Sequence, residues 1–417
     1  MPSVVFVAPV LSENAQRMVT AVASLPDVRL GVISGDPQEN APAELRAGIA
    51  AHWRVDDVLD SGQLLWAAEN LSRQLGPIHR MFGAYEQLQV PLAEARQRLG
   101  IEGLTVEAAM NFRDKSRMKD VLRAAGLPTA RHQLVERIEQ ARAFTERVGF
   151  PVVVKPPAGA GSLDTFKAEH ADALHDALRR TPPAPGRAVL LEEFVTGDEH
   201  SLETISVDGR PVFHSLTHYI PSPLEVMRNP WIQWCVVLPR EADEPQYDDA
   251  RRAGDAALRA LGMRTGLSHM EWFRRKDGSV AISEIAARPP GAQITTLISR
   301  AHDMDFVREW ARVMVYSQFE APPRKYAVGC AYLRGQGRAG GAGGAGGSGR
   351  RVTAIRGLDE AAQAVGALVT DVKLPSLGQG PGANYEGEGY VIVRHPETRV
   401  VVQAVQRLVS LIRVDMG

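Results

Sequence analysis

Two glutamates are the first chemically suggestive feature of the chain, because a predicted hairpin places them face to face. Residues 269–291 read HMEWFRRKDGSVAISEIAARPPG, two alternating runs around Asp277-Gly278, which is typical of a two-residue hairpin turn. With that turn, counting back along both strands places Glu271 opposite Glu284. Like charges at opposed positions are destabilising. At a separation of ~5 Å and an effective dielectric constant of ~20 they repel by roughly 3 kcal/mol.

Three arrangements would relieve this repulsion. One carboxyl group is protonated, the register differs, or a divalent cation lies between the two side chains. Mg²⁺ favours one or two protein carboxylates combined with nucleotide phosphates. The hairpin taken alone leaves the three open.

A lysine at the end of an apolar strand adds a second element. Lys155 ends the run PVVVK and is followed at once by PPAGAGS, so its ammonium group and the loop N–H groups can surround phosphates. The alternative is a surface lysine beside an ordinary turn. Lys115 in RDKSRMK is a weaker candidate, because lysines in the first turn of a helix are usually solvated. The neighbouring Asp114 is typical of a helix cap.

Acidic residues near a third apolar run form the next element. Glu192, Glu193 and Glu199 belong to LEEFVTGDEHSLE, where carboxylates can accept hydrogen bonds from adenine N6 or from ribose hydroxyls. The alternative is a solvated strand edge. A phosphate-binding lysine, an adenine-side acidic strand and a metal-binding carboxylate pair, in this order, are far more specific together than any of them alone.

The elements that must position these residues begin with alternating strands and helices. Runs such as SVVFVAPV and VRLGVIS predict buried strands, and SENAQRMVTAVASL predicts an amphipathic helix between them. Strands that alternate with helices over the first hundred residues indicate a parallel, Rossmann-like sheet. No GxGxxG occurs there, so the dinucleotide-binding version of that fold has no support.

The later part of the chain predicts a mixture of strands and helices. A helix is expected after Asp114, then a strand, a Gly-rich loop and a second strand within 149–170, and a further strand at 188–195. Strands and helices from about residue 325 predict a closing α+β unit. The glycine-rich segment 335–351 is interpreted as a flexible connection, because no Lys-Ser/Thr follows it.

Composition excludes several classes of protein. A chain of 417 residues can form two or three domains, and its 44% hydrophobic and 23% charged residues are ordinary for a soluble globular protein. The net charge of −1 gives no electrostatic argument for nucleic acid or an anionic membrane. Two distant cysteines, Cys235 and Cys330, exclude a disulfide framework. With neither a signal peptide nor a long apolar run at hand, we expect a cytoplasmic protein.

Four segments together resemble the ATP-grasp superfamily over nearly the whole chain: 114–115, 149–162, 191–203 and 269–291. The resemblance implies an α/β and α+β protein with the ATP-grasp fold. Its expected parts are a Rossmann-like preATP-grasp domain at 1–110 and an ATP-grasp domain at 111–324, in which about 128–196 form a mobile lid subdomain. A C-terminal α+β subdomain at 325–417 is expected to carry the Gly-rich loop 335–351.

The resemblance also implies an ATP site. Lys115 and Lys155 look like the lysines that contact phosphates, and Glu199 looks like the ribose-hydroxyl acceptor. The lid loop over the phosphates resembles Gly159, Ala160, Gly161 and Ser162. Glu192 resembles the family's adenine-side acid. The strand whose backbone contacts the adenine edge is matched by Glu193, Phe194 and Val195.

The last segment resembles the family's metal and arginine positions. Glu271 and Glu284 match the carboxylates that hold Mg²⁺, with Mn²⁺ as a substitute, and Arg288 matches the arginine that holds the substrate carboxylate. Arg288, Lys155 and Glu284 are therefore the expected catalytic residues. Many members have asparagine where this chain has Ala286, which weakens the case for two metal ions. In the predicted register, Ala286 faces His269, which shapes the pocket or is simply packed.

The implied reaction activates a carboxylate as an acyl phosphate. The ending of the chain resembles that of L-amino-acid ligases and related carboxylate–amine ligases, so we expect an amide or peptide bond between small, amino-acid-like molecules, with release of ADP and phosphate. The expected partners are small-molecule substrates, and a homodimer is compatible with the resemblance. Candidate substrate residues are His218, Arg228, Trp234, His269 and Arg288. The alternatives are a carboxylase or formate-using ligase of the same fold and an ATP-binding protein without turnover.

Overall fold

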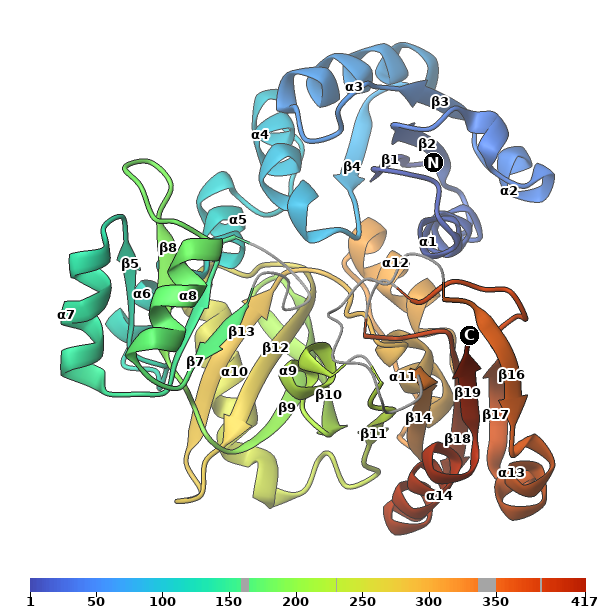
Figure 1. Ribbon diagram of the computed structural model, residues 1–417. Helices are drawn as coiled ribbons and strands as arrows, with labels where there is room; N and C mark the ends of the chain where they lie inside the picture. Colours follow the sequence, from blue (N-terminus) through green and yellow to red (C-terminus); the bar gives the residue numbers. More distant parts are fainter. Residues whose placement is uncertain (159–164, 230, 337–349, 383–384) are drawn as a thin grey trace.

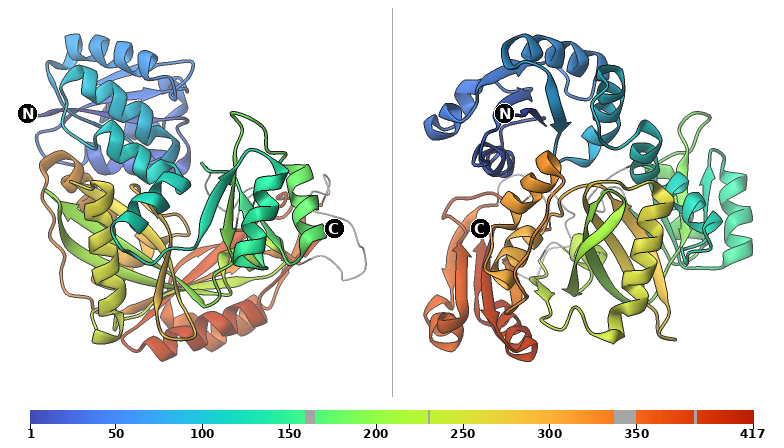
Figure 2. Two further views of the ribbon diagram at one scale, coloured as in Figure 1. Left: turned by 90° about the vertical axis from the view of Figure 1, so that its left-hand side faces the viewer. Right: turned by 180° about the vertical axis from the view of Figure 1, so that it is seen from behind.

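The structure is a computed structural model that describes residues 1–158, 165–229, 231–336, 350–382 and 385–417. Its N-terminal elements form one lobe and the elements around β5 to β8 form a smaller one (Figure 1). Both lobes lie against a larger body that contains the longest sheet. The turned views show the two smaller lobes standing apart from each other, joined to the body on neighbouring sides (Figure 2).

The N-terminal lobe is a parallel four-stranded sheet in the order β3-β2-β1-β4. Its strands are β1 (Ser3–Ala8), β2 (Arg29–Ser34), β3 (Ala51–Arg54) and β4 (Ile78–Phe82). Its helices are α1 (Glu13–Ala23), α2 (Ala43–Ala47), α3 (Ser61–Leu75) and α4 (Gln89–Leu99). All six residues of β1 are buried, as an apolar run in a sheet covered on both faces requires. The predicted Rossmann-like sheet is confirmed.

The small lobe is an antiparallel sheet in the order β5-β8-β6-β7. Its strands are β5 (His132–Val135), β6 (Val152–Lys155), β7 (Phe166–Ala168) and β8 (Val189–Glu193), and its helices are α7 (Ile138–Val148) and α8 (Ala171–Arg180). These elements share one apolar core. Two helices, α5 (Val106–Arg113) and α6 (Lys115–Ala124), connect it to the N-terminal lobe. The predicted loop residues Gly159, Ala160, Gly161 and Ser162 lie outside the described residues.

The body contains an antiparallel eight-stranded sheet in the order β13-β12-β9-β10-β11-β14-β18-β17. Its strands are β9 (Asp198–Val207), β10 (Arg210–Ile220), β11 (Trp234–Leu238), β12 (Gly266–Arg274), β13 (Val280–Ala286), β14 (Ala327–Leu333), β17 (Val369–Lys373) and β18 (Gly389–His395). Its helices are α9 (Pro223–Arg228), α10 (Asp248–Leu261), α11 (Ile294–His302), α12 (Phe306–Tyr316), α13 (Leu358–Val365) and α14 (Thr398–Leu411).

The predicted C-terminal strands are present and continue this sheet. β14 pairs with β11 on one side and with β18 on the other. A separate three-stranded sheet, in the order β15-β19-β16, is formed by β15 (Gly335–Gln336), β16 (Val352–Arg356) and β19 (Arg413–Met416). Strands from before and after residue 325 therefore belong to one continuous sheet. The division of the chain into domains stays a prediction.

Candidate active site

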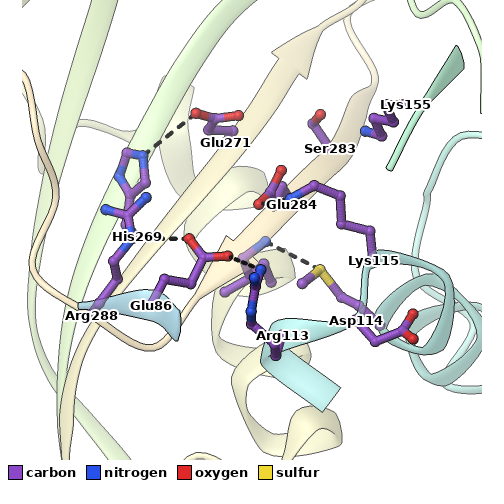
Figure 3. Close-up of polar contacts among 12 residues, drawn as sticks. Glu86, Arg113, Asp114, Lys115, Lys155, His269, Glu271, Ser283, Glu284 and Arg288 are labelled. Atoms are coloured by element: carbon purple, nitrogen blue, oxygen red, sulfur yellow. Dashed lines mark hydrogen bonds and ion pairs between the residues drawn. The ribbon is translucent and has the colours of Figure 1, made fainter. Parts of the chain in front are cut away.

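The predicted site residues come together at a cavity where the small lobe faces the β12–β13 hairpin (Figure 3). The cavity has a volume of about 140 Å³ and is open to solvent. Its charged residues come from the start of α6, the ends of β6 and β8, the start of β9, the β12–β13 hairpin and the segment after it. The predicted residues that line it are Lys115, Lys155, Glu192, Glu193, Phe194, Val195, Glu199, His269, Glu271, Glu284 and Arg288.

The hairpin has the predicted register at its glutamates. Glu271 pairs with Glu284 and His269 pairs with Ala286. Both pairs face the cavity, because all four residues line it. A carboxylate pair thus lies at the cavity wall, as the hairpin pattern indicated.

The predicted two-residue turn is wrong. Arg275 and Ser279 close the loop, since the Arg275 N–H donates to the Ser279 carbonyl at 2.9 Å. Gly278 adopts a positive φ of 84°, which suits a three-residue loop with a left-handed third position. The extra loop residue is offset by a β-bulge: beyond Glu271, Trp272 pairs with Ile282 and Ser283 has no partner in the ladder. The longer loop and the bulge each shift the strand register by one residue, in opposite directions, so the predicted pairing of Glu271 with Glu284 is unchanged.

Lys115 lies at the first position of α6 and is buried. Asp114 caps that helix by accepting from Ser116 N and Arg117 N at 2.9 Å each, so the cap interpretation is confirmed. Lys115 is not a solvated helix-end lysine: its Nζ forms an ion pair with Glu284. Burial alone would raise the pKa of Glu284, but Lys115 and Lys155 outweigh it and lower that pKa to about 2. Glu284 is therefore a carboxylate held by lysines.

Glu192 is buried between two lysines. Lys155 Nζ lies 2.9 Å from one carboxylate oxygen and Lys119 Nζ lies 3.4 Å from the other. Burial opposes ionisation, yet the two ammonium groups keep the pKa of Glu192 below its usual value. The predicted adenine-side acid thus holds the predicted phosphate lysine in this structure, and its role toward adenine stays a prediction.

Lys119 is a site residue that sequence reasoning missed. Its side chain is 1% exposed, and its Nζ donates to the Ser283 carbonyl at 2.7 Å. The available signal was its position one helical turn after Lys115, which puts both lysines on one face of α6.

Replacing Lys119 with methionine should lower the free energy of unfolding by about 3–5 kcal/mol, because the bulge carbonyl and one oxygen of Glu192 lose their buried partner. Denaturant unfolding monitored by circular dichroism measures this. The matched control is Lys325→Met, which breaks an exposed pair with Asp303 and should cost at most ~1 kcal/mol. Equal losses of unfolding free energy in both variants would contradict a stabilising role for the buried Lys119 contacts.

His269 is hydrogen-bonded to the fully buried carboxylate of Glu203. His269 Nδ1 lies 2.8 Å from Glu203 Oε1, and Ser201 and Thr217 donate hydroxyl hydrogen bonds to the same carboxylate. His269 Nε2 points to Glu271, 3.7 Å away (Figure 3). Burial lowers the pKa of His269, but the contacts with Glu203 and Glu271 outweigh it and raise that pKa to about 9. An imidazolium therefore lies beside the predicted metal carboxylate.

Glu199 lies half-buried on the same sheet face. Burial and the nearby Glu271 raise the pKa of Glu199 to about 8. The carboxyl group whose protonated form is favoured is therefore that of Glu199 on the neighbouring strand β9, which lies outside the predicted pair, while Glu284 stays ionised.

Arg288 follows β13 and contacts a residue from the N-terminal lobe. Its Nε donates to Glu86 Oε2 at 3.1 Å, and Arg113 donates to the other oxygen of Glu86 at 3.1 Å (Figure 3). Glu86 is 5% exposed. Sequence reasoning missed Glu86, because 202 positions separate it from Arg288 and no pattern near it marks the contact.

Two predicted substrate residues, Trp234 and His218, do not line the cavity. Trp234 is packed in the core, stacked on Tyr332, with its indole N–H donating to the Tyr385 carbonyl. His218 lies on the neighbouring strand β10 and contacts Tyr247 and His200. Arg228 ends α9, and its side chain lies outside the described part of the structure.

The His200–His218 pair should make the fold labile to acid. Burial lowers the pKa of His200 to about 3 and that of His218 to about 4. Both values are depressed, so between pH 6.5 and about 4 the unfolded chain binds protons that the folded chain does not, and stability falls as pH falls. The slope is about 1.4 kcal/mol per pH unit for each histidine.

The variant His200→Gln should flatten this pH dependence of the unfolding midpoint between pH 7 and pH 5. Substituting the exposed His175 in the same way serves as the control and should leave the slope as in the original protein. An unchanged slope in His200→Gln would contradict a buried neutral imidazole.

The residues fit a magnesium–nucleotide site. Two opposed carboxylates face a cavity that also presents Lys115 and Lys155, and Mg²⁺ takes one or two protein carboxylates when phosphates supply further oxygens. Across the described ranges, no three His, Cys, Asp or Glu side chains gather as a metal site of their own. Nor does any helix within those ranges have the length and apolar character needed to cross a membrane.

Comparison with known proteins gives one family match and several similar relatives. The ATP-grasp domain family matches residues 120–302. The L-arginine-specific L-amino acid ligase of Bacillus subtilis is 26% identical over 284 residues, which cover 65% of this chain and 67% of that protein.

Two solved structures share the fold over the chain. The L-amino acid ligase of Bacillus licheniformis has a TM-score of 0.77 at 18% identity, with 99% of this chain and 98% of that one covered. The biotin carboxylase domain dimer of the Hydrogenobacter thermophilus 2-oxoglutarate carboxylase, in complex with ADP, its magnesium salt and bicarbonate, has a TM-score of 0.67 at 16% identity, with coverage of 99% and 90%. Residues 120–302 therefore match the ATP-grasp domain family, and the whole chain shares the fold of these two solved structures.

Proposed function

We propose that this protein is an ATP-dependent carboxylate–amine ligase that joins small, amino-acid-like molecules through an acyl phosphate and releases ADP and phosphate. The observation that carries the proposal is one cavity lined by two lysines, two opposed glutamates and an arginine. The similarity to an L-amino acid ligase of Bacillus subtilis supports the substrate class. The division at 1–110, 111–324 with a lid at about 128–196, and 325–417 belongs to the same proposal.

The lysines would bind the phosphates of ATP. In this structure Lys115 is paired with Glu284 and Lys155 with Glu192, so each ammonium group already lies at the cavity wall in a fixed direction. Glu271 and Glu284 would hold Mg²⁺, which supplies positive charge to the phosphate oxygens. The strand residues Glu193, Phe194 and Val195, which line the same cavity, would contact the adenine edge, with Glu199 toward the ribose.

Arg288 would bind the substrate carboxylate. Glu86 and the Pro289 carbonyl occupy its Nε and one terminal nitrogen, while the residue still lines the cavity. The bound carboxylate attacks the γ-phosphorus, the bond to ADP breaks, and an acyl phosphate forms. The amine then attacks the acyl carbon, phosphate leaves, and the amine loses a proton. Preorganised positive groups favour this sequence because they stabilise the charge that develops on the transferred phosphoryl group.

The test is a screen for phosphate release with ATP and amino acids, singly and in pairs, followed by mass spectrometry of the products. Pair-dependent release with a dipeptide or amide product is the expected result. Release that depends on bicarbonate or formate would instead favour the carboxylase or formate-using reaction. Tight ATP binding without ADP formation across the whole screen would favour a nucleotide-binding protein without turnover.

A further inference from the structure

The β-bulge in the hairpin changes which side chains face the cavity. In a regular strand, successive side chains point to opposite faces, so only one of two adjacent residues can reach a given side. Ser283 and Glu284 are adjacent, yet both line the nucleotide cavity. The ladder explains this, because Glu284 pairs with Glu271 and Ile282 pairs with Trp272, which leaves Ser283 as the extra residue of the bulge.

A buried lysine holds the bulge in place. Lys119 donates from Nζ to the Ser283 carbonyl at 2.7 Å, which satisfies the group that the bulge removes from the ladder. The same Nζ lies 3.4 Å from Glu192 on β8. Since Lys119 is 1% exposed and packed from both sides, the position of Ser283 is fixed by three elements: α6, β8 and β13.

The hydroxyl of Ser283 lies among the charged groups of the site. Figure 3 shows it between Glu284 and Lys155, at the level of Glu271. Among the described residues, none exchanges a hydrogen bond with this hydroxyl. Ala286, two positions after Glu284, offers only a methyl group to the cavity. The bulge thus brings an uncharged hydroxyl to the wall that also carries Lys155, Glu271 and Glu284.

We propose that the Ser283 hydroxyl is a further nucleotide-binding group, which contacts the metal–phosphate end of the nucleotide and supplies an oxygen that Ala286 does not. A hydroxyl suits both contacts, because it donates one hydrogen bond to a phosphate oxygen or offers its lone pairs to Mg²⁺. The inference rests on the proposed function, since it assumes that this cavity binds ATP.

The test measures binding rather than turnover. Mn²⁺ affinity in the presence of ADP is titrated by electron paramagnetic resonance, and ADP affinity is measured calorimetrically with and without Mn²⁺. For Ser283→Ala we expect at least a fivefold weaker affinity in one of these titrations. Loss only with Mn²⁺ identifies a metal contact, and loss in both conditions identifies a phosphate contact. Ser283→Thr keeps the hydroxyl and should bind within twofold of the original protein.

The matched control is Ser279→Ala, which removes a hydroxyl at the exposed tip of the same hairpin and should change neither affinity. Affinities of Ser283→Ala that equal those of the original protein would overturn the inference and leave the proposed function standing. An original protein that binds neither ADP nor Mn²⁺–ADP would overturn both.

Discussion

The variant Glu284→Gln should lose turnover by at least ~10³-fold while the fold survives. The substitution removes the charge that pairs with Lys115 and that would hold Mg²⁺ opposite Glu271, so the phosphates of ATP lose the positive charge that the metal would supply. The amide has the same shape, so packing of β13 is preserved. ADP release under saturating substrates measures the loss, and circular dichroism with the unfolding midpoint measures the fold.

Asp277→Asn is the matched control for Glu284→Gln. It removes one carboxylate from the exposed tip of the same hairpin and keeps the oxygen that accepts from Ser279. Its turnover should stay within about twofold of the original protein, because Coulomb interactions at this distance are screened by solvent. Near-normal turnover in Glu284→Gln would refute the metal assignment.

Replacing Arg288 with lysine should lower kcat/KM for the carboxylate substrate by about 10²–10³-fold and change ATP affinity by less than about threefold. Lysine keeps the charge but loses the planar fork that binds a carboxylate through two hydrogen bonds. Glu86 would still be paired with Arg113 in this variant, so the interface with the N-terminal lobe should hold. Steady-state kinetics with the acid varied, alongside ATP binding by calorimetry, separates the two effects.

Arg113→Lys provides the comparison for Arg288→Lys. Arg113 contacts the same carboxylate, Glu86, but does not line the cavity. Its substitution should reduce kcat/KM less than tenfold. If both variants lose the same factor, the arginines act only through the interface, and the role of Arg288 in substrate binding fails.

Much of the fold followed from local patterns. Strand and helix periods in the first hundred residues predicted the parallel sheet, because alternation and helical spacing are set by each element's own geometry. The continuation of the main sheet through β14 and β18 was not predictable in this way, since an apolar strand pairs equally well at several edges and only tertiary packing selects one.

In the hairpin, the pairing of the two glutamates was predicted correctly although the predicted turn was wrong. The Asp-Gly signal gave a turn one residue too short, and the bulge at Ser283 returned the register to the predicted one at Glu271 and Glu284. Local sequence does not encode the bulge, because its cause lies on α6: Lys119 donates to the carbonyl that the bulge leaves unpaired.

By itself, the sequence determined which residue types stand at the ends of the strands and in which order: lysines, then acids, then a carboxylate pair and an arginine. Only the tertiary structure decided their partners. It placed Glu86 of the N-terminal lobe on Arg288, Lys119 on the bulge, and Lys115 on Glu284. The physical reason is that periodicity fixes the direction of a side chain relative to its own element, whereas ion pairs between distant segments depend on how separately folded elements pack together.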